Sequence, residues 1–390
     1  MKGRFSLQAA SAGLLAALVG FASSPVIIAG LVGVGASQAQ AASGLMALSI
    51  AMGVCGVALS LATKQPISIA WSTPGGALLA TSGIVEGGFP AAVGAFLVTA
   101  GLVIVAGLWR PLGRWVAAIP VSIANAMLAG VLLGLCLAPV KAIAVHPVLA
   151  LSIIVVWAVV FVLRRLYAVP VAVVLTVILT MATTDMSASS LGPLWPDPIL
   201  VVPEFSLAAT IGIALPLFIV TMASQNIPGI AVLKVNGYAP APGRLFSITG
   251  AFSLIVAPFG GHAVNLAAIT AALCAGEDAH PDPSRRYWAA VVAGATYVVL
   301  GLMAGAATAL ISVSPPILIE AVAGLALIGA FGSALMGSVS ATQDREAAVL
   351  TFLVTASGLT FLGISGAFWG LVAGGAMLAL TRFRSRSAPA

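Results

Sequence analysis

The chain has 390 residues, of which 61% are hydrophobic and only 7% are charged, and its mean hydropathy is +1.16. A soluble globular protein has about 25% charged residues, so this composition excludes a soluble fold and indicates a polytopic membrane protein. The net charge of +6 comes from 16 Lys and Arg that stand singly or in pairs, which excludes a nucleic-acid-binding face. Cys55, Cys136 and Cys274 lie far apart in apolar runs and fit neither a disulfide framework nor a metal site. We expect no metal and no cofactor.

Apolar stretches of membrane-spanning length follow one another through the chain. Since a helix needs about 20 residues to cross the bilayer, we predict an all-α polytopic membrane protein with about 14 membrane segments. The first is interpreted as a span because its apolar run, 9–34, exceeds the roughly 7–15 residues of a signal peptide. The predicted segments are 10–33, 43–63, 66–84, 90–109, 117–138, 147–163, 168–183, 207–233, 244–258, 261–275, 288–311, 317–336, 346–363 and 365–381.

The positions of Lys and Arg support this count. With the N-terminus in the cytoplasm and the loops alternating sides, fifteen of the 16 basic residues fall on the cytoplasmic side and only Lys141 falls outside. An excess of Lys and Arg in cytoplasmic loops is the usual bias of membrane proteins, so both termini are predicted to be cytoplasmic. The fifteen are Lys2, Arg4, Lys64, Arg110, Arg114, Arg164, Arg165, Lys234, Arg244, Arg285, Arg286, Arg345, Arg382, Arg384 and Arg386.

The longest polar connection, residues 183–206, separates two halves of seven segments each. An odd number of segments per half means that the halves insert with opposite orientation, and inverted repeats of this kind are a common transporter plan. We assign residues 1–185 to the first repeat, 186–206 to an external linker and 207–390 to the second repeat.

The third segment does not read as a continuous helix. Residues 67–71 follow a proline and include the β-branched Ile67 and Ile69 and the aromatic Trp71, which favours an extended strand. Thr73-Pro74 then predicts the N-cap and first position of a half-helix. The tenth segment has a similar break, in which Pro258-Phe259-Gly260-Gly261 precedes a few extended residues and an alanine-rich half-helix. Broken segments in corresponding places of two halves point to a transporter's binding site, whereas the alternative is a pair of structural kinks.

Two facing half-helices would direct their N-termini at one point and form an anion site. The first would use amides near Thr73, Gly75 and Gly76, and the second those near Val264 and Asn265. The residues expected to contact the substrate are Ser24 in the first span, Trp71, Ser72, Thr73 and Gly75 at the first break, Gln225 and Asn226 in the eighth segment, and Gly261, His262, Val264 and Asn265 at the second break.

Some of these residues have a second interpretation. Gln225 and Asn226 lie in mid-membrane and either bind a carboxylate or hold helices together. His262 either carries a coupled proton or is a neutral histidine bonded to backbone. Phe21, Trp71 and Phe259 lie beside the breaks and either flank an aromatic ligand or pack in the core.

Four stretches of the chain resemble a known family. Residues 70–75, 222–229, 258–270 and 353–358 are similar to motifs of the bacterial benzoate transport protein (BenE-type) family, and the resemblance extends over essentially the whole chain. It implies an inner-membrane symporter that takes up benzoate with a proton.

More distantly, the plan resembles nucleobase transporters and sulfate-permease-type anion carriers. Those carriers have seven-plus-seven inverted repeats and a site between the third and tenth segments. By that resemblance, segments 1–4 and 8–11 form a core domain, and segments 5–7 and 12–14 form a gate domain. The chain departs from the nucleobase carriers in the eighth segment, where Ser224-Gln225-Asn226 stands in place of their carboxylate.

The sequence therefore predicts a secondary transporter, not an enzyme, that imports benzoate or a similar aromatic carboxylate with a proton by alternating access. The alternative within transport is a carrier of a nucleobase or of another small organic or inorganic anion. A membrane-embedded receptor or enzyme is disfavoured because the loops are short and acidic residues are nearly absent from the segments. The expected partners are the aromatic anion, the proton and the bilayer, and homodimerisation is left open.

Overall fold

The structure is a computed structural model that describes residues 5–109, 111, 120–183, 195–361 and 364–387. Four of the basic residues used for the topology, Lys2, Arg4, Arg110 and Arg114, lie outside these residues. The predicted boundary at residues 185 and 186 lies outside them too, as do parts of the predicted segments 117–138 and 346–363.

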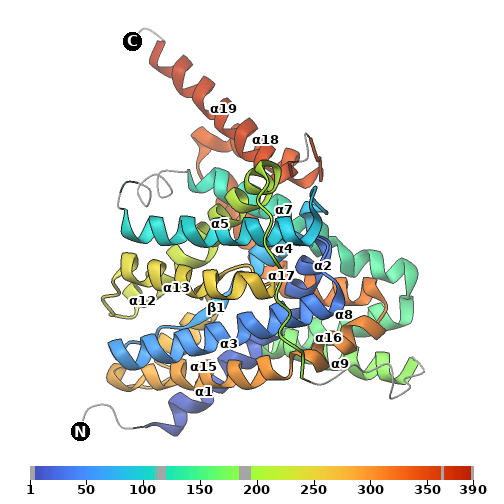
Figure 1. Cartoon of the computed structure of the whole chain (residues 1–390), viewed down its shortest axis with the longest axis vertical. Helices are drawn as coiled ribbons and strands as arrows, with labels where there is room; N and C mark the ends of the chain where they lie inside the picture. Colours follow the sequence, from blue (N-terminus) through green and yellow to red (C-terminus); the bar gives the residue numbers. More distant parts are fainter. Residues whose placement is uncertain (1–4, 110, 112–119, 184–194, 362–363, 388–390) are drawn as a thin grey trace.

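The first half of the chain is a series of helices interrupted by one short strand (Figure 1). Its elements are α1 (Leu7–Phe21), α2 (Ser24–Gly33), α3 (Gln38–Thr63), β1 (Ile69–Trp71), α4 (Thr73–Ser82), α5 (Gly88–Leu108), α7 (Val121–Val145), α8 (Pro147–Arg164), the 3-10 turn η1 (Arg165–Tyr167) and α9 (Ala168–Thr183).

The second half has the same general character and ends in a long helix that extends away from the body of the molecule in Figure 1. Its elements are α10 (Leu207–Ala209), η2 (Thr210–Ala214), α11 (Leu215–Thr221), η3 (Met222–Asn226), α12 (Ile227–Val235), α13 (Pro242–Val256), η4 (Ala257–Phe259), β2 (Val264–Leu266), α14 (Ile269–Ala275), η5 (Pro283–Arg285), α15 (Tyr287–Leu302), α16 (Ala304–Val313), α17 (Pro316–Val339), η6 (Thr342–Asp344), α18 (Arg345–Ala356) and α19 (Gly366–Ser387).

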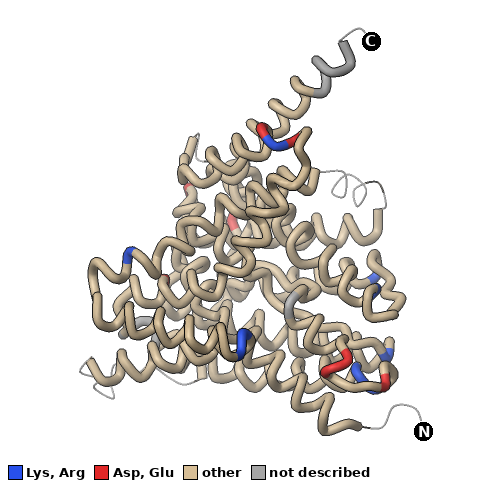
Figure 2. Tube along the Cα trace, turned by 180° about the vertical axis from the view of Figure 1, so that it is seen from behind, with Lys and Arg blue, Asp and Glu red and all other residues tan. Residues whose placement is uncertain are grey.

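Within the described residues, eight helices are long and apolar enough to cross a membrane. Figure 2 shows long uncharged stretches of chain, with the charged residues mainly at helix ends and connections. The chain is therefore a mostly helical, multi-pass membrane protein, and the count of about 14 segments stays a prediction. The eight are Leu7–Gly33, Gln38–Thr63, Gly88–Leu108, Val121–Val145, Pro147–Thr183, Leu207–Val235, Pro242–Phe259 and Pro316–Val339.

The two strands form an antiparallel ladder in the centre of the molecule. Ile69 is paired with Leu266 and Trp71 with Val264, so the ladder joins the two halves of the chain. Backbone bonds extend it at both ends, since Ser72 N donates to the carbonyl of Ala263 and Ala267 N donates to that of Ser68. Because neither strand is helical, its backbone N–H and C=O groups have no helical partners, and the other strand supplies hydrogen bonds to them.

The two half-helices begin at other residues than the sequence predicted, α4 one residue earlier and α14 several residues later. The N-cap of α4 is Ser72, whose hydroxyl accepts from Gly75 N, so Thr73 is the first helical residue and not the cap. The second correction is larger, because Val264 and Asn265 lie in strand β2 and the seven-residue α14 starts only at Ile269. Strand pairing with β1 outweighs the helix propensity of the alanine-rich stretch there.

Helices of the two halves pack against each other in matching pairs. Helix α3 lies against α15, α5 lies against α13, and α7 lies against α17. In the first two pairs backbones touch at glycines: a Cβ added to Gly294 would lie 2.6 Å from the carbonyl oxygen of Gly53, and one added to Gly107 would lie 2.5 Å from that of Gly243. Such close approach is available only to residues without a side chain.

Residues 195–206, the described part of the polar connection between the halves, run as an extended trace over the helices in Figure 1 and are bonded to them. Ile199 N donates to the hydroxyl of Ser43 at 2.9 Å, and Glu204 N donates to the carbonyl of Pro90 at 3.0 Å. Val201 N donates to the carbonyl of Pro258 at 2.7 Å. The connection therefore ties α3 and α5 of the first half to η4 of the second.

Candidate functional site

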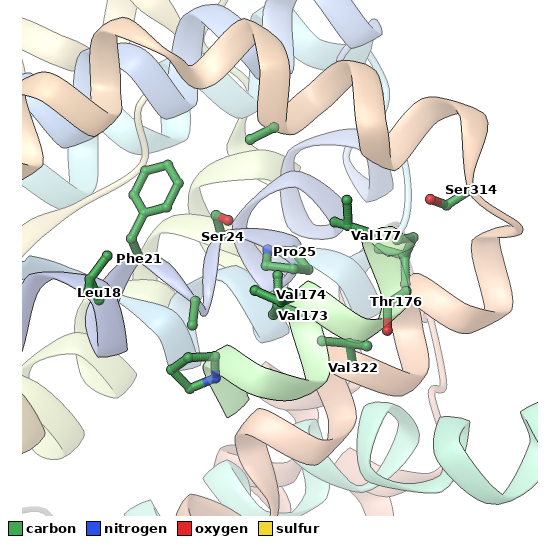
Figure 3. Close-up of a pocket in the computed structure, with 14 residues that line it drawn as sticks. Leu18, Phe21, Ser24, Pro25, Val173, Val174, Thr176, Val177, Ser314 and Val322 are labelled. Carbon is green, nitrogen blue, oxygen red and sulfur yellow. The ribbon is translucent and has the colours of Figure 1, made fainter. Parts of the chain in front are cut away.

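A cavity of about 340 Å³ lies where α1 and α2 face α9, α16 and α17 (Figure 3). Its size is that of a small-molecule site, which usually occupies about 300–1,000 Å³. The wall is almost entirely aliphatic or aromatic, so the cavity suits an apolar group rather than a hydrated ion. The lining residues are Leu18, Phe21, Ala22, Ser24, Pro25, Pro170, Val173, Val174, Thr176, Val177, Ala307, Ser314, Ile319 and Val322.

Among the polar residues of the wall, Ser24 differs from the other two. Thr176 donates its hydroxyl to the carbonyl of Ala172 at 2.8 Å, and Ser314 donates to Thr180 Oγ1 at 3.1 Å. Ser24 is 6% exposed, and its hydroxyl makes no hydrogen bond to the part of the chain that the structure describes. Its hydroxyl oxygen is open to the cavity and free to bond a ligand there, so Ser24 is the polar anchor that the cavity offers.

The N-termini of two helices meet beside this anchor. Helices α2 and α4 have ten residues each and pack side by side. Because each helix carries roughly half a positive charge at its N-terminus, two parallel helices that start together favour an anion at that end. No side chain caps α2 by a hydrogen bond. The contacts run in the same order along both helices: Ser23 with Thr73, Ile27 with Gly76, and Gly33 with Ala80.

Ser23 joins the break between α1 and α2 to the start of α4. Its hydroxyl donates to the carbonyl of Gly20 at 2.7 Å. It accepts from Trp71 Nε1 at 2.9 Å and lies 3.2 Å from Thr73 Oγ1, which must be the donor because the hydrogen of Ser23 is already used. One side chain therefore fixes the position of Ser24, of strand β1 and of the α4 N-terminus relative to each other.

Ser72 makes the corresponding connection to the second half of the chain. Its hydroxyl accepts from Thr221 Oγ1 of α11 at 2.9 Å, and its carbonyl lies 2.9 Å from His262 Nε2. Since a carbonyl oxygen only accepts, His262 carries its hydrogen on Nε2, and Nδ1 is an acceptor. Nδ1 is buried and has no partner among the described residues.

The polar residues of the eighth segment lie in the π-helical turn η3, which ends two residues before Pro228. Asn226 Oδ1 accepts from Leu266 N at 2.9 Å, and Gln225 Oε1 accepts from Ala268 N at 3.4 Å. Both side chains thus bond the backbone from β2 to the start of α14, and their contact with substrate stays a prediction. Asn265 bonds its own neighbour's carbonyl through Nδ2, and its Oδ1 is buried without a partner in the described part of the chain.

Of the residues predicted to contact substrate, only Ser24 lines the cavity. Trp71 is 1% exposed and lies behind Phe21, with ring centroids 5.8 Å apart, and Phe259 is not part of the wall. Phe21 does line the cavity, and contact of Trp71 and Phe259 with an aromatic ligand stays a prediction. The amides of Gly75 and Val264 are also occupied, by Ser72 Oγ and Ser253 Oγ. The valines of α9 and α17 gave no signal in the sequence, because they resemble the other aliphatic residues of every span.

Comparisons with known proteins give relatives over nearly the full length. The family model described as "Benzoate membrane transport protein" (BenE) matches residues 3–380. The chain is 42% identical to the "Inner membrane protein YdcO" of Escherichia coli (strain K12), with 93% of each chain covered. It is 34% identical to the "Benzoate membrane transport protein" of Acinetobacter baylyi, with 96% of this chain and 95% of that protein covered.

Solved structures share the fold at low sequence identity. The transmembrane domain of a cyanobacterial bicarbonate transporter, BicA, aligns with a TM-score of 0.59 at 14% identity, covering 96% of this chain and 99% of that one. The murine anion transporter Slc26a9 in its inward-facing state also aligns with a TM-score of 0.59 at 14% identity, covering 98% of this chain and 69% of that one. With the family model matched from residue 3 to residue 380, the chain belongs to the BenE family of benzoate membrane transport proteins, which are transporters and not enzymes.

Proposed function

We propose that this protein is a secondary active transporter that imports benzoate, or a similar aromatic carboxylate, together with a proton. The observation that carries the proposal is the pairing of an apolar cavity with one free hydroxyl beside two helix N-termini. An aromatic ring fits the aliphatic wall, and a carboxylate fits Ser24 and the positive ends of α2 and α4. The relative from Acinetobacter baylyi that is named for benzoate supports the same substrate.

Uptake of labelled benzoate into proteoliposomes tests the proposal. Ser24→Ala removes a hydrogen bond to a charged group, which is worth about 1.5–3 kcal/mol, so benzoate affinity should fall by about 10- to 100-fold. Thr176→Val is the matched control, because the Thr176 hydroxyl faces the same cavity but already bonds Ala172. Wild-type vesicles without benzoate uptake would exclude the substrate, and equal affinities of the two variants would exclude the anchor.

His262 is our candidate for the proton carrier. The unpartnered Nδ1 is a free proton acceptor, and Nε2 is bonded to the N-cap residue of α4, so protonation and anion binding would act on the same helix N-terminus. An imposed inward proton gradient should drive benzoate accumulation by the wild-type protein. In His262→Gln the accumulation should become independent of the gradient, and an unchanged gradient dependence would remove His262 from the coupling.

Alternating access by two inverted repeats is the mechanism that we propose. The pairing of α3 with α15 and of α5 with α13 is what a two-fold relation between the halves would produce, and it supports the inverted repeats. The cavity lies between α1 and α2 of the proposed core and α9 and α17 of the proposed gate. Unlabelled benzoate inside the vesicles should then accelerate entry of labelled benzoate, and lack of acceleration would count against this mechanism. Both termini would be cytoplasmic.

A nucleobase or a small inorganic anion is the alternative substrate. The fold is shared with a bicarbonate transporter, and this supports an inorganic anion as the alternative substrate. The aliphatic wall disfavours both, because a nucleobase needs several hydrogen bonds and a hydrated anion gains nothing from apolar contact. Competition by uracil or bicarbonate at the level of benzoate would favour the alternative.

A further inference from the structure

Resting on the proposed function, the cavity carries an inference about the range of substrates. We propose that the site takes aromatic carboxylates larger than benzoate, with apolar substituents on the ring, and rejects ring-hydroxylated ones.

The cavity is larger than one benzene ring requires. An engineered apolar cavity of about 150 Å³ binds benzene, and the cavity beside Ser24 has about 340 Å³. With the carboxylate at Ser24, the ring extends toward Val173 and Val177 of α9 and toward Val322 of α17, all of which lie around Pro25 and the anchor in Figure 3. Space remains at that side for an alkyl group or a second ring, and its aliphatic lining would gain contact from either.

The same wall offers a hydroxyl group on the ring no free donor, and apart from the oxygens of Thr176 and Ser314 its side chains around the ring are aliphatic. The hydroxyls of Thr176 and Ser314 already donate to Ala172 and Thr180, and Ser24 is engaged by the carboxylate. A phenolic hydroxyl buried against valines loses its bond to water without replacement. The site therefore discriminates by the polarity of the substituent rather than by the size of the ring.

Competition with labelled benzoate in proteoliposomes, and direct calorimetric binding to the purified protein, test this inference. Each buried methylene favours binding by about 4-fold, so 4-isopropylbenzoate should bind at least about 10-fold more tightly than benzoate. By the desolvation argument, 4-hydroxybenzoate should bind at least about 10-fold more weakly. If 4-hydroxybenzoate bound as tightly as 4-isopropylbenzoate, or more tightly, the inference would be overturned. The proposed function would still stand as long as benzoate itself binds.

A variant of α9 locates the effect in this cavity. Val173→Phe fills part of the free space, so it should abolish the advantage of 4-isopropylbenzoate over benzoate, measured as the ratio of the two affinities in the same variant. Ile178→Phe is the control, because Ile178 lies on the same helix, is 56% exposed and is not part of the wall. A retained preference for the larger acid in Val173→Phe, at normal protein stability, would place its binding elsewhere. If the wild-type protein bound none of benzoate, 4-isopropylbenzoate and 4-hydroxybenzoate, both the inference and the proposed function would be overturned.

Discussion

Replacing Ser23 by Ala tests whether one hydroxyl holds the cavity wall in place. The variant removes the bond to Gly20 and the acceptor of Trp71 Nε1 and Thr73 Oγ1. Trp71 is 1% exposed, so its indole N–H has no access to water once Ser23 Oγ is gone. A buried donor without a partner costs about 1–3 kcal/mol, and the lost bond to Gly20 adds about 1 kcal/mol. We expect Ser23→Ala to destabilise the protein by about 2–4 kcal/mol.

The assay is thermal unfolding of the purified protein, followed by benzoate binding. A loss of about 2–4 kcal/mol lowers the unfolding midpoint by several degrees. Benzoate should also bind more weakly, since Ser24 is attached to the loosened break. Ser11→Ala is the control, because the Ser11 hydroxyl is exposed and bonds only Gln8 within its own turn. Ser23→Thr keeps the hydroxyl and should keep most of the stability.

A double-mutant cycle gives the result that would refute this reasoning. Trp71→Phe removes the indole donor, so combining it with Ser23→Ala should cost clearly less than the sum of the two single variants. If the two effects add within about 0.5 kcal/mol, the bond between Trp71 and Ser23 contributes nothing and the role assigned to Ser23 is wrong.

Two further predictions concern the contacts that position the site. Gly53→Ala places a methyl group on the carbonyl oxygen of Gly294 and should cost about 1–3 kcal/mol in thermal unfolding, whereas Gly101→Ala, with nothing within 4 Å, should be neutral; equal midpoints would show that α3 and α15 can separate freely. Ser365→Ala removes the donor to Gly212 O, whose helical partner is missing because residue 216 is proline. Ser365→Ala should lower the free energy of unfolding by about 1–3 kcal/mol more than the exposed control Ser357→Ala does. Equal stabilities of the two variants would mean that the Gly212 carbonyl finds another donor.

Local backbone preferences predicted the elements at the centre of this molecule better than they predicted the site. Residues 67–71 favour an extended chain by themselves, and the strand β1 lies within them. The region after Gly261 has weak local preferences, and there the strand arises from pairing with β1, which no local pattern contains.

Local preferences also do not predict which helix starts beside α4. The sequence predicts the partner of α4 in the matching segment of the second half. The structure instead places the start of α2 beside the start of α4, and it builds the apolar wall from α9 and α17. Which of many similar valines face one cavity depends on tertiary packing alone.

The ladder between β1 and β2 has a consequence for how the protein is made. During synthesis, β1 enters the membrane region long before residues 264–266 are translated. Its N–H and C=O groups therefore lack their β2 partners until more than half of the chain has been inserted. The first half alone therefore holds an unpaired strand edge among its helices. A chain that stops after α9 would therefore be degraded by quality-control proteases rather than persist as a folded first half. The transporter folds stably only once β2 has been synthesised and has paired with β1.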